Sequence, residues 1–345
     1  MTRIGILGCG RIARIYHLQI LAGHGDAELG AVAESDEGLL REAQRIAPAA
    51  RACADWRTVL EDGSIDAVVV CLPTGLHSGA AVAAFEAGKH VYLEKPIATT
   101  LDAAGDVVAA WRTSGRIGMI GFNQRFHPAV ALAREVVREG KIGRVVGARV
   151  VSGSPPRELP AWKRRRADGG GVLLDAFSHH VDLARFLFDD EVHDVTASTR
   201  SLRSEDDNAW ATMTMESGVR VESRASFTSV QENRFEITGE AGGLSVDRIE
   251  GRMMLHPVDV AWSRLTRIRR GIVKLANVPG RVRSLLTPPR DPSYDLALSA
   301  FTRAVWERSP VAPDPRDGER SLAVVLAAEA SARDGRRVVV APPLP

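Results

Sequence analysis

The chain has 345 residues, a formal net charge of +2 and a hydrophobic content of 45%. A chain of this length is longer than most domains that have a single hydrophobic core, so we expect two domains. A net charge near zero gives no strong electrostatic attraction to nucleic acid or to a membrane surface. No stretch reaches the roughly 20 apolar residues that a membrane helix needs. We therefore expect neither nucleic acid nor a membrane as a partner.

The cysteines indicate a reducing compartment. Cys9, Cys53 and Cys71 are odd in number and widely spaced, which fits neither a disulfide framework nor a metal site. A core strand already begins at about Arg3, so we expect no signal peptide. The sequence therefore predicts a cytoplasmic protein.

The first predicted strand, Arg3 to Leu7, runs into a glycine-rich turn and a helix that we expect to continue to about Ala22. The turn reads Gly-x-Gly-x-x-Ala, the fingerprint of dinucleotide-binding folds. Its first glycine permits the tight turn, its second lets the backbone approach a pyrophosphate, and the alanine lets the helix pack closely on the strand. The helix N-terminus then faces the phosphates. The residues expected at the phosphates are Gly8, Gly10, Arg11, Ile12 and Ala13.

The second strand, Leu29 to Ala33, ends at the acidic residue Glu34. A carboxylate at this position accepts hydrogen bonds from the ribose hydroxyls of adenosine and repels the additional phosphate of NADP. A solvated acid at a strand end is the simpler interpretation, and Ser35 beside it could tolerate a phosphate. The sequence thus favours NAD over NADP.

Two further strands lie between Asp66 and Pro96, separated by a helix. The second of them, His90 to Leu93, brings Lys95 to its carboxyl end, which is the edge of a parallel sheet where ligands bind. Lys95 is one of only five lysines in the chain. A partly buried lysine can give and take a proton near neutral pH, whereas arginine cannot; a surface lysine is the alternative. The residues expected to face the cofactor at this edge are Leu72, Pro73, Thr74, His77, Glu94 and Lys95.

The predicted fold class is α/β. Strands and helices alternate up to a short strand at Ile117 to Gly121, which indicates a doubly wound parallel sheet, and the alternation ends at Phe122. From Val192 to Arg252, period-two alternation predicts a mostly antiparallel sheet with one exposed face. We therefore expect a dinucleotide-binding Rossmann domain over residues 1–121 and an α+β domain with an open sheet over residues 122–345.

A glycine run at 169–171 opens a predicted helix, Val172 to Leu187, that carries Asp175 and His179. Four residues apart, the two side chains share one helix face, and a carboxylate beside an imidazole holds the ring and raises its basicity. Such a pair suits a general base for a hydroxyl proton. With Asp182 it could instead ligate a metal, and a surface ion pair is the simplest alternative. No cysteine or further histidine stands at metal-ligand spacing, so we expect no metal.

Five motifs occur in order along the chain: the glycine fingerprint, Pro73-x-x-x-His77, Glu94-Lys95-Pro96, Asn123-Gln124-Arg125 and the Asp175-x-x-x-His179 helix. Together they resemble the Gfo/Idh/MocA oxidoreductases, the family of glucose–fructose oxidoreductase and inositol dehydrogenase, over nearly the whole chain. The resemblance implies a nicotinamide enzyme that acts on sugars or cyclitols, with a Rossmann domain followed by a substrate domain. Family members usually associate through the exposed sheet face, which implies a homodimer or homotetramer.

The resemblance also implies roles for single residues. Lys95 matches the lysine that contacts the substrate and the nicotinamide ribose and relays the proton, His179 matches the acid/base, and Asp175 matches the carboxylate that tunes it and touches the substrate. Phe177 departs from the glycine often found two residues after the aspartate, so we expect a narrower pocket or a shifted helix. Asn123 is expected at the cofactor, and the expected substrate ligands are Lys95, Arg125, Trp162, Arg164, Asp175 and His179.

Two basic segments remain. The run Lys163 to Arg166 precedes the glycine run on a loop that can overhang the pocket, where an arginine such as Arg164 would suit a carboxylate or phosphate on an anionic substrate. A solvated charge run or a subunit contact is the alternative. The run His256 to Arg290 has apolar residues near helical spacing, which favours a packed lid or an oligomer contact over a helix on a membrane surface.

The leading hypothesis is an NAD(P)-dependent dehydrogenase or reductase that transfers a hydride between the nicotinamide and a ring hydroxyl or ketone of a sugar, sugar derivative or cyclitol. An alternative keeps the fold and recycles a tightly bound NAD, for glycoside cleavage or for epimerisation through a keto intermediate. A non-catalytic NAD(H)-binding sensor is a third hypothesis. The presence of Lys95, Asp175 and His179 disfavours it, because a sensor needs no proton relay.

Overall fold

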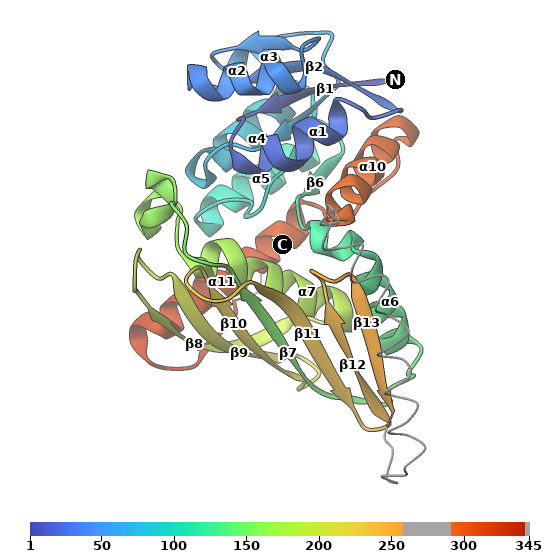
Figure 1. Ribbon diagram of the computed structural model, residues 1–345, viewed down its shortest axis with the longest axis vertical. Helices are drawn as coiled ribbons and strands as arrows, with labels where there is room; N and C mark the ends of the chain where they lie inside the picture. Colours follow the sequence, from blue (N-terminus) through green and yellow to red (C-terminus); the bar gives the residue numbers. More distant parts are fainter. Residues whose placement is uncertain (258–290, 342–345) are drawn as a thin grey trace.

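The computed structural model describes residues 1–257 and 291–341. Within these residues the chain forms two β-sheets, which we call sheet A and sheet B, and they lie one above the other in Figure 1. Apart from its first two residues, the basic run predicted from His256 to Arg290 lies outside the described residues. None of the helices in the described parts is long and apolar enough to cross a membrane.

Sheet A has six parallel strands in the described part of the chain, in the order β3-β2-β1-β4-β5-β6. The order reverses between β1 and β4, which is the doubly wound arrangement with its ligand crevice at the carboxyl ends of the strands. The strands are β1 (Thr2–Leu7), β2 (Ala27–Ala33), β3 (Arg51–Cys53), β4 (Ala67–Val70), β5 (His90–Leu93) and β6 (Gly118–Ile120). The helical segments among them are η1 (Ala13–His17), α1 (Leu18–Leu21), α2 (Glu37–Ile46), α3 (Arg57–Leu60), η2 (Thr74–Leu76), α4 (His77–Glu86) and α5 (Leu101–Ser114).

Both faces of sheet A are buried, which explains its runs of apolar residues. Tyr92 belongs to a core cluster that contains Leu18 of α1, whereas its neighbour Leu93 belongs to a second cluster that contains Phe85 of α4. Neighbouring residues of a strand point to opposite faces, so a strand covered on both faces needs apolar residues at successive positions.

The helix α10 (Pro292–Glu307) returns from the end of the chain to sheet A, where its residue Phe301 packs edge-on against Tyr92 with ring centroids 5.7 Å apart. It lies beside α1 and β6 in Figure 1. The segment after residue 121 therefore contributes to the packing of both sheets, and the division at residue 121 stays a proposal.

Sheet B has eight strands in the described residues, in the order β13-β12-β11-β7-β10-β9-β8-β14. All neighbours are antiparallel except β7 and β10. The strands are β7 (Val145–Gly153), β8 (Val192–Arg200), β9 (Asn208–Met215), β10 (Arg220–Ser226), β11 (Glu232–Gly239), β12 (Gly242–Asp247), β13 (Arg252–Pro257) and β14 (Val338–Val339). The helical segments are η3 (Asn123–Phe126), α6 (Pro128–Arg138), η4 (Ala161–Arg164), η5 (Arg166–Asp168), η6 (Leu173–Phe177), α7 (Ser178–Phe188) and α11 (Pro315–Asp334).

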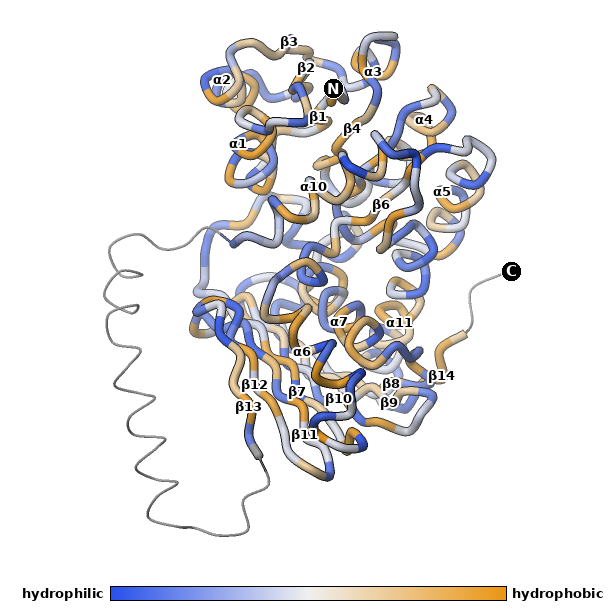
Figure 2. Tube along the Cα trace, turned by 90° about the vertical axis from the view of Figure 1, so that its right-hand side faces the viewer, coloured by the Kyte–Doolittle hydropathy of each residue, from blue (hydrophilic) through white to orange (hydrophobic). Residues whose placement is uncertain are grey.

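Helices α7 and α11 lie between the two sheets, as Figures 1 and 2 both show. They cover one face of sheet B, and the opposite face carries polar and exposed side chains such as Trp210, Arg220 and Glu222 at alternate positions. The predicted fold class, a Rossmann sheet followed by a mostly antiparallel sheet with one open face, is confirmed.

Two helices differ locally from the prediction: the one that follows the glycine fingerprint and the one that carries Asp175 and His179. The first one contains a π-helical segment, η1, and only then the α-helix α1, and the second one begins as the π-helical segment η6 before α7. A π-helical turn is wider than an α-helical turn and occurs often at functional sites. The spacing of side chains in η1 and η6 is therefore not that of the regular helices predicted.

Candidate active site

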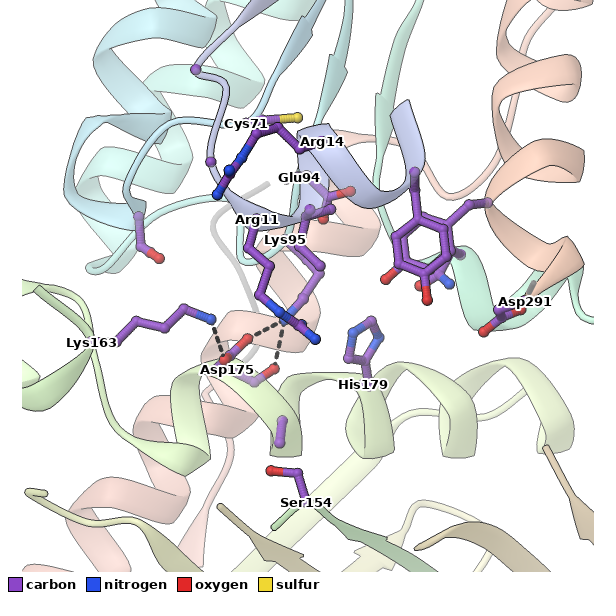
Figure 3. Close-up of a pocket in the computed structure, with 18 of the residues that line it drawn as sticks. Arg11, Arg14, Cys71, Glu94, Lys95, Ser154, Lys163, Asp175, His179 and Asp291 are labelled. Carbon is purple, nitrogen blue, oxygen red and sulfur yellow. Dashed lines mark hydrogen bonds and ion pairs between the residues drawn. The ribbon is translucent and has the colours of Figure 1, made fainter. Parts of the chain in front are cut away.

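A cavity of about 1710 Å³ opens between the carboxyl ends of the sheet A strands and the start of α7. Its walls come from the β1–η1 turn, the ends of β2, β4 and β5, the loop before η4, the π-helical segment η6 and the ends of the neighbouring sheet B strands. Figure 3 shows the region where Lys95 from sheet A meets Asp175, Lys163 and His179 from the second half of the chain.

The β1–η1 turn has the geometry that a pyrophosphate site requires. Gly8 has φ +92°, and a Cβ at this position would lie 2.7 Å from the carbonyl oxygen of Cys71, the residue after β4, so only glycine fits. Gly10 has no heavy atom within 4 Å of its Cβ position, which leaves its backbone open to the cavity. Arg11 and Ile12 also line the cavity, whereas Ala13 is fully buried and packs in the core.

Glu34 is held rigidly at the end of β2. Its Oε2 accepts a hydrogen bond of 2.8 Å from the backbone N–H of Cys9, and its Oε1 accepts one of 3.1 Å from Asp36 N. The nearby arginine side chains of this end have carboxylate partners, Glu42 for Arg14 and Asp55 for Arg57. A carboxylate fixed at this position can accept hydrogen bonds from ribose hydroxyls.

His77 braces the two loops that border the cavity. Its Nδ1 lies 2.7 Å from the carbonyl oxygen of Pro96 and its Nε2 lies 2.8 Å from that of Leu72. Burial lowers the pKa of His77, although both carbonyls and Glu94 oppose the shift. Leu72, Pro73 and Thr74 line the cavity beside it, so the ring holds their loop against the loop of Lys95.

Lys95 and Lys163 both bind the carboxylate of Asp175. Lys95 Nζ donates to the carbonyl oxygen of Asp175 at 2.9 Å and to its Oδ1, and Lys163 Nζ donates to its Oδ2 at 2.7 Å. Burial alone would raise the pKa of Asp175, but the two ammonium groups hold it well below its usual range. The carboxylate is therefore ionised and fixes both lysine side chains at the cavity.

The predicted contact between Asp175 and His179 is absent from the described structure, and this expectation was wrong. The π-helical turn changes the register between the two residues, and the lysines occupy the carboxylate instead. Among the described residues, His179 Nδ1 has no hydrogen-bond partner, and the ring packs edge-on against Phe122 at 6.1 Å. Burial, then the charges of Lys95 and Arg248, hold the pKa of His179 well below its usual range, with Asp175 opposing.

The glycine run makes room for a loop of the chain itself, and Phe177 acts differently from the prediction. A Cβ on Gly170 would lie 2.4 Å from the carbonyl oxygen of Lys163, so the glycine admits the chain's own loop, and thereby brings Lys163 to the cavity. Phe177 is buried away from the residues that line the cavity and packs edge-on against His180 at 6.3 Å. It does not narrow the described pocket.

Arg125 and Arg164 do not belong to the described residues that line the cavity. Arg125 Nη2 donates to Asp182 at 2.6 Å and Arg125 Nη1 donates to Asp317 at 3.2 Å, so its guanidinium ties η3 to α7 and α11. Arg164 donates to the carbonyl oxygen of Leu159 and is exposed. We therefore remove both from the expected substrate ligands, because their donors are directed elsewhere.

Several residues of the cavity wall were not predicted. Trp162 lines the cavity as expected. The basic residue that lines the cavity next to it is Lys163, whereas Arg164 was expected. Asn123 also lines the cavity, and its Nδ2 donates to Ser293 Oγ at 2.7 Å. No sequence pattern indicated the other contributors, which come from η1, from loops and from the distant helix α10. These residues are Tyr16, Ser154, Arg157, Arg248, Asp291 and Tyr294.

No group of three or more histidine, cysteine or acidic side chains in the described residues has the arrangement of a metal site. Lys95 and Lys163 pair with Asp175 at the cavity, and Arg248 pairs with Asp291. Such a cavity can bind a polar ligand and exchange a proton through its lysine and imidazole groups.

Comparisons with known proteins extend over both halves of the chain. Residues 2–122 match the model of an oxidoreductase family described as having an NAD-binding Rossmann fold, and residues 130–245 match the GFO/IDH/MocA C-terminal domain. Among curated proteins, the chain is 30% identical to 1,5-anhydro-D-fructose reductase of Ensifer adhaerens, over 97% of this chain and 98% of that protein. It is 29% identical to myo-inositol 2-dehydrogenase of Thermotoga maritima, with the same coverage of both chains.

Among solved structures, the WlbA dehydrogenase from Bordetella pertussis, in complex with NADH and UDP-GlcNAcA, superposes with a TM-score of 0.83 and 25% sequence identity. The match covers 99% of this chain and 98% of the other. The arrangement of the two sheets is thus also found in a known dehydrogenase.

Proposed function

The chain belongs to the Gfo/Idh/MocA family of oxidoreductases with an NAD-binding Rossmann fold, and we propose that it transfers a hydride between NAD and a ring hydroxyl or ketone of a sugar, sugar derivative or cyclitol. The observation that carries this proposal is the convergence of Lys95, Asp175 and His179 in the cavity that also contains Gly10 and Glu34. One cavity thereby combines a dinucleotide site with groups that handle a proton.

The residues at the sheet A edge fit NAD. The open backbone at Gly10 and the first turn after it suit the pyrophosphate, because the first N–H groups of a helix have no partner within the helix. The fixed carboxylate of Glu34 suits the ribose hydroxyls and supports a preference for NAD over NADP. Bound there, the cofactor accepts a hydride from a carbinol carbon, or in reduced form donates one to a ketone.

The chain's own side chains handle the proton and the position of the substrate. His179 takes the hydroxyl proton during oxidation and returns it during reduction, and its lowered pKa keeps the ring neutral and ready to accept. Lys95 donates a hydrogen bond to the same oxygen and stabilises negative charge that develops on it. Asp175 holds Lys95 in place and presents its remaining lone pairs to a substrate hydroxyl.

Four basic side chains gather near Asp175 in the cavity, which supports an anionic substrate such as a uronate, a sugar phosphate or a nucleotide sugar. Arg11, Lys95, Arg157 and Lys163 all line the cavity, together with the carboxylate of Asp175. Burial and the neighbouring charge of Arg11 lower the pKa of Arg157, and a bound anion would oppose this shift because it stabilises the charged guanidinium. UDP-GlcNAcA, which the Bordetella enzyme binds, carries negative charge.

The open face of sheet B supports the proposal of a homodimer or homotetramer. Trp210 on this face is 45% exposed. A large aromatic side chain on an uncovered sheet face is typical of a surface that pairs with another protein. Light scattering of the purified protein, with Trp210→Glu as the disrupting variant, tests this assembly. The three free cysteines, two of them buried, support the proposed cytoplasmic location.

The experiment that tests the proposed function is nicotinamide absorbance over time with the purified protein, NAD or NADP, and a panel of sugars and cyclitols. The panel contains neutral, phosphorylated, uronate and nucleotide-linked members. The proposal predicts reduction of NAD by one chemical class, faster than reduction of NADP. Cofactor binding without turnover in either direction, while a sugar is cleaved or epimerised, would replace it with the recycled-NAD alternative.

A further inference from the structure

The carboxylate of Glu94 is held by an imidazole that lies outside the cavity. His17 Nε2 and Glu94 Oε1 are 2.7 Å apart, although the residues are 77 positions apart in the sequence. Glu94 lines the cavity at the end of β5, whereas the side chain of His17 is fully buried behind it. The contact therefore fixes the direction of a carboxylate that faces the ligand space.

The surroundings of this pair leave it little freedom. The ring of His17 packs edge-on against Tyr92 at 5.5 Å and against Tyr294 at 5.8 Å. Gly121 packs against the carboxylate of Glu94. A Cβ on Gly121 would lie 3.0 Å from the carboxyl carbon of Glu94, so the missing side chain of Gly121 makes room for the carboxylate. His17 also ends the π-helical segment η1, whose wider turn sets the position of the ring.

The charge of Glu94 has no cationic side chain to neutralise it in the described structure. In the described residues its carboxylate makes no ion pair with a lysine or arginine: it contacts the imidazole of His17, and the next residue, Lys95, directs its ammonium to Asp175. Burial and then the charge of Glu94 raise the pKa of Tyr92 and of Tyr294 well above the usual range. The carboxylate of Glu94 therefore lines this corner of the cavity without a lysine or arginine partner among the described residues, and a cationic ligand group would be attracted to it.

The topology indicates which part of a dinucleotide meets this corner. The adenosine half belongs with Glu34 at the end of β2, so the other half lies across the reversal of strand order, at the ends of β4 and β5. The nicotinamide ring carries a positive charge when oxidised and none when reduced. We propose that Glu94, oriented by His17, makes the protein bind the oxidised cofactor more tightly relative to the reduced one, and so makes the bound cofactor harder to reduce.

This proposal rests on the proposed function only in the identity of the cofactor, and its test needs no sugar. Glu94→Gln removes the charge with little change of shape. Titration calorimetry with NAD and fluorescence titration with NADH give the two dissociation constants. The ratio of the constant for NAD to that for NADH should rise about tenfold in the variant, because a charge–charge attraction is lost from one form alone. An unchanged ratio would overturn the proposal.

His17 is a positioning residue in this account, and two variants of it separate orientation from packing. His17→Phe keeps a ring without a donor, and His17→Gln keeps a side-chain donor. The ratio should rise in His17→Phe and stay near the wild-type value in His17→Gln. A purely structural role would weaken the binding of both cofactor forms together and leave the ratio unchanged, which would contradict the role of His17.

The outcomes also separate this proposal from the proposed function. A wild-type protein that binds neither NAD nor NADH contradicts both. A protein that binds both forms, oxidises a sugar and shows no change of the ratio in Glu94→Gln contradicts only the inference about Glu94.

Discussion

Lys95 Nζ donates a hydrogen bond of 2.9 Å to the carbonyl oxygen of Asp175 and a second one to its carboxylate, which joins the end of β5 to the π-helical segment η6. This contact connects the two halves of the chain at the cavity. The lysine is therefore positioned by the second half of the chain, although it belongs to a sheet A loop. Proton chemistry at Lys95 depends on both halves being in place.

We predict that Lys95→Met lowers kcat by about 100-fold or more, because the variant loses the ammonium that binds the substrate oxygen. The matched control is Lys89→Met. Lys89 Nζ donates to the carbonyl oxygens of Asp62 and Ile65, both at 2.8 Å, and does not line the described cavity. Steady-state kinetics and thermal unfolding should show opposite patterns: lower kcat for the first variant, lower stability for the second. Similar kcat losses in both would contradict the assignment.

The pH dependence of substrate oxidation reports on His179. The ring must be neutral to accept a proton, and its folded-state pKa lies well below the usual value because of burial and the charges of Lys95 and Arg248. Activity is therefore lost only as the pH falls through that lowered pKa, and kcat/KM should show no acid limb near the usual histidine pKa of about 6.5. Asp175 opposes the shift, so Asp175→Asn should move the limb to still lower pH. A limb at or above the usual value would contradict this role.

Lys163 and Arg164 are adjacent in the sequence, but only Lys163 lines the described cavity. Lys163 donates to Asp175 at 2.7 Å, whereas Arg164 is directed to the carbonyl oxygen of Leu159. Lys163→Ala should lower kcat/KM about tenfold, the order expected for a lost charge-assisted hydrogen bond. Arg164→Ala should leave it nearly unchanged. The reverse order would show that the loop presents Arg164 to the substrate.

The Arg125 network should affect stability more than chemistry. Its guanidinium is buried between Asp182 and Asp317, so Arg125→Met leaves two carboxylates without this partner and should cost about 3–5 kcal/mol of unfolding free energy. The exposed pair of Arg144 and Glu240 provides the control, and Arg144→Met should give no measurable change. Urea unfolding measures both. A loss of cofactor or substrate affinity in Arg125→Met at unchanged stability would return this residue to the site.

The parts of the fold that follow from local patterns could be predicted from the sequence. Alternation of short apolar strands with helices identified sheet A, because each strand buried on both faces needs its own apolar run. The helices Glu37–Ile46 and Leu101–Ser114 belong to this alternation, and each starts after a side chain that caps its first turn, Asp36 or Thr100. The short strand Arg51–Cys53 was missed, because three residues carry too little pattern.

Contacts between distant segments could not be predicted. The spacing of Asp175 and His179 indicated a regular helix, but a π-helical turn and the competing lysines separate them, and neither feature has a sequence signal. The pairing of His17 with Glu94 and the return of α10 to sheet A likewise depend on three-dimensional packing. The positions of motifs at strand ends were thus predictable, whereas their hydrogen-bond partners were not.

The most direct test of the central claim is the fate of the hydrogen on the carbinol carbon. A single turnover with NAD and a substrate that carries deuterium at that carbon, followed by mass spectrometry of the nicotinamide, measures hydride transfer itself. We predict that deuterium appears in the reduced cofactor with the wild-type protein, and that the transfer is strongly slowed in Lys95→Met. Deuterium that leaves to solvent without entering the cofactor would contradict hydride transfer as the reaction of this protein.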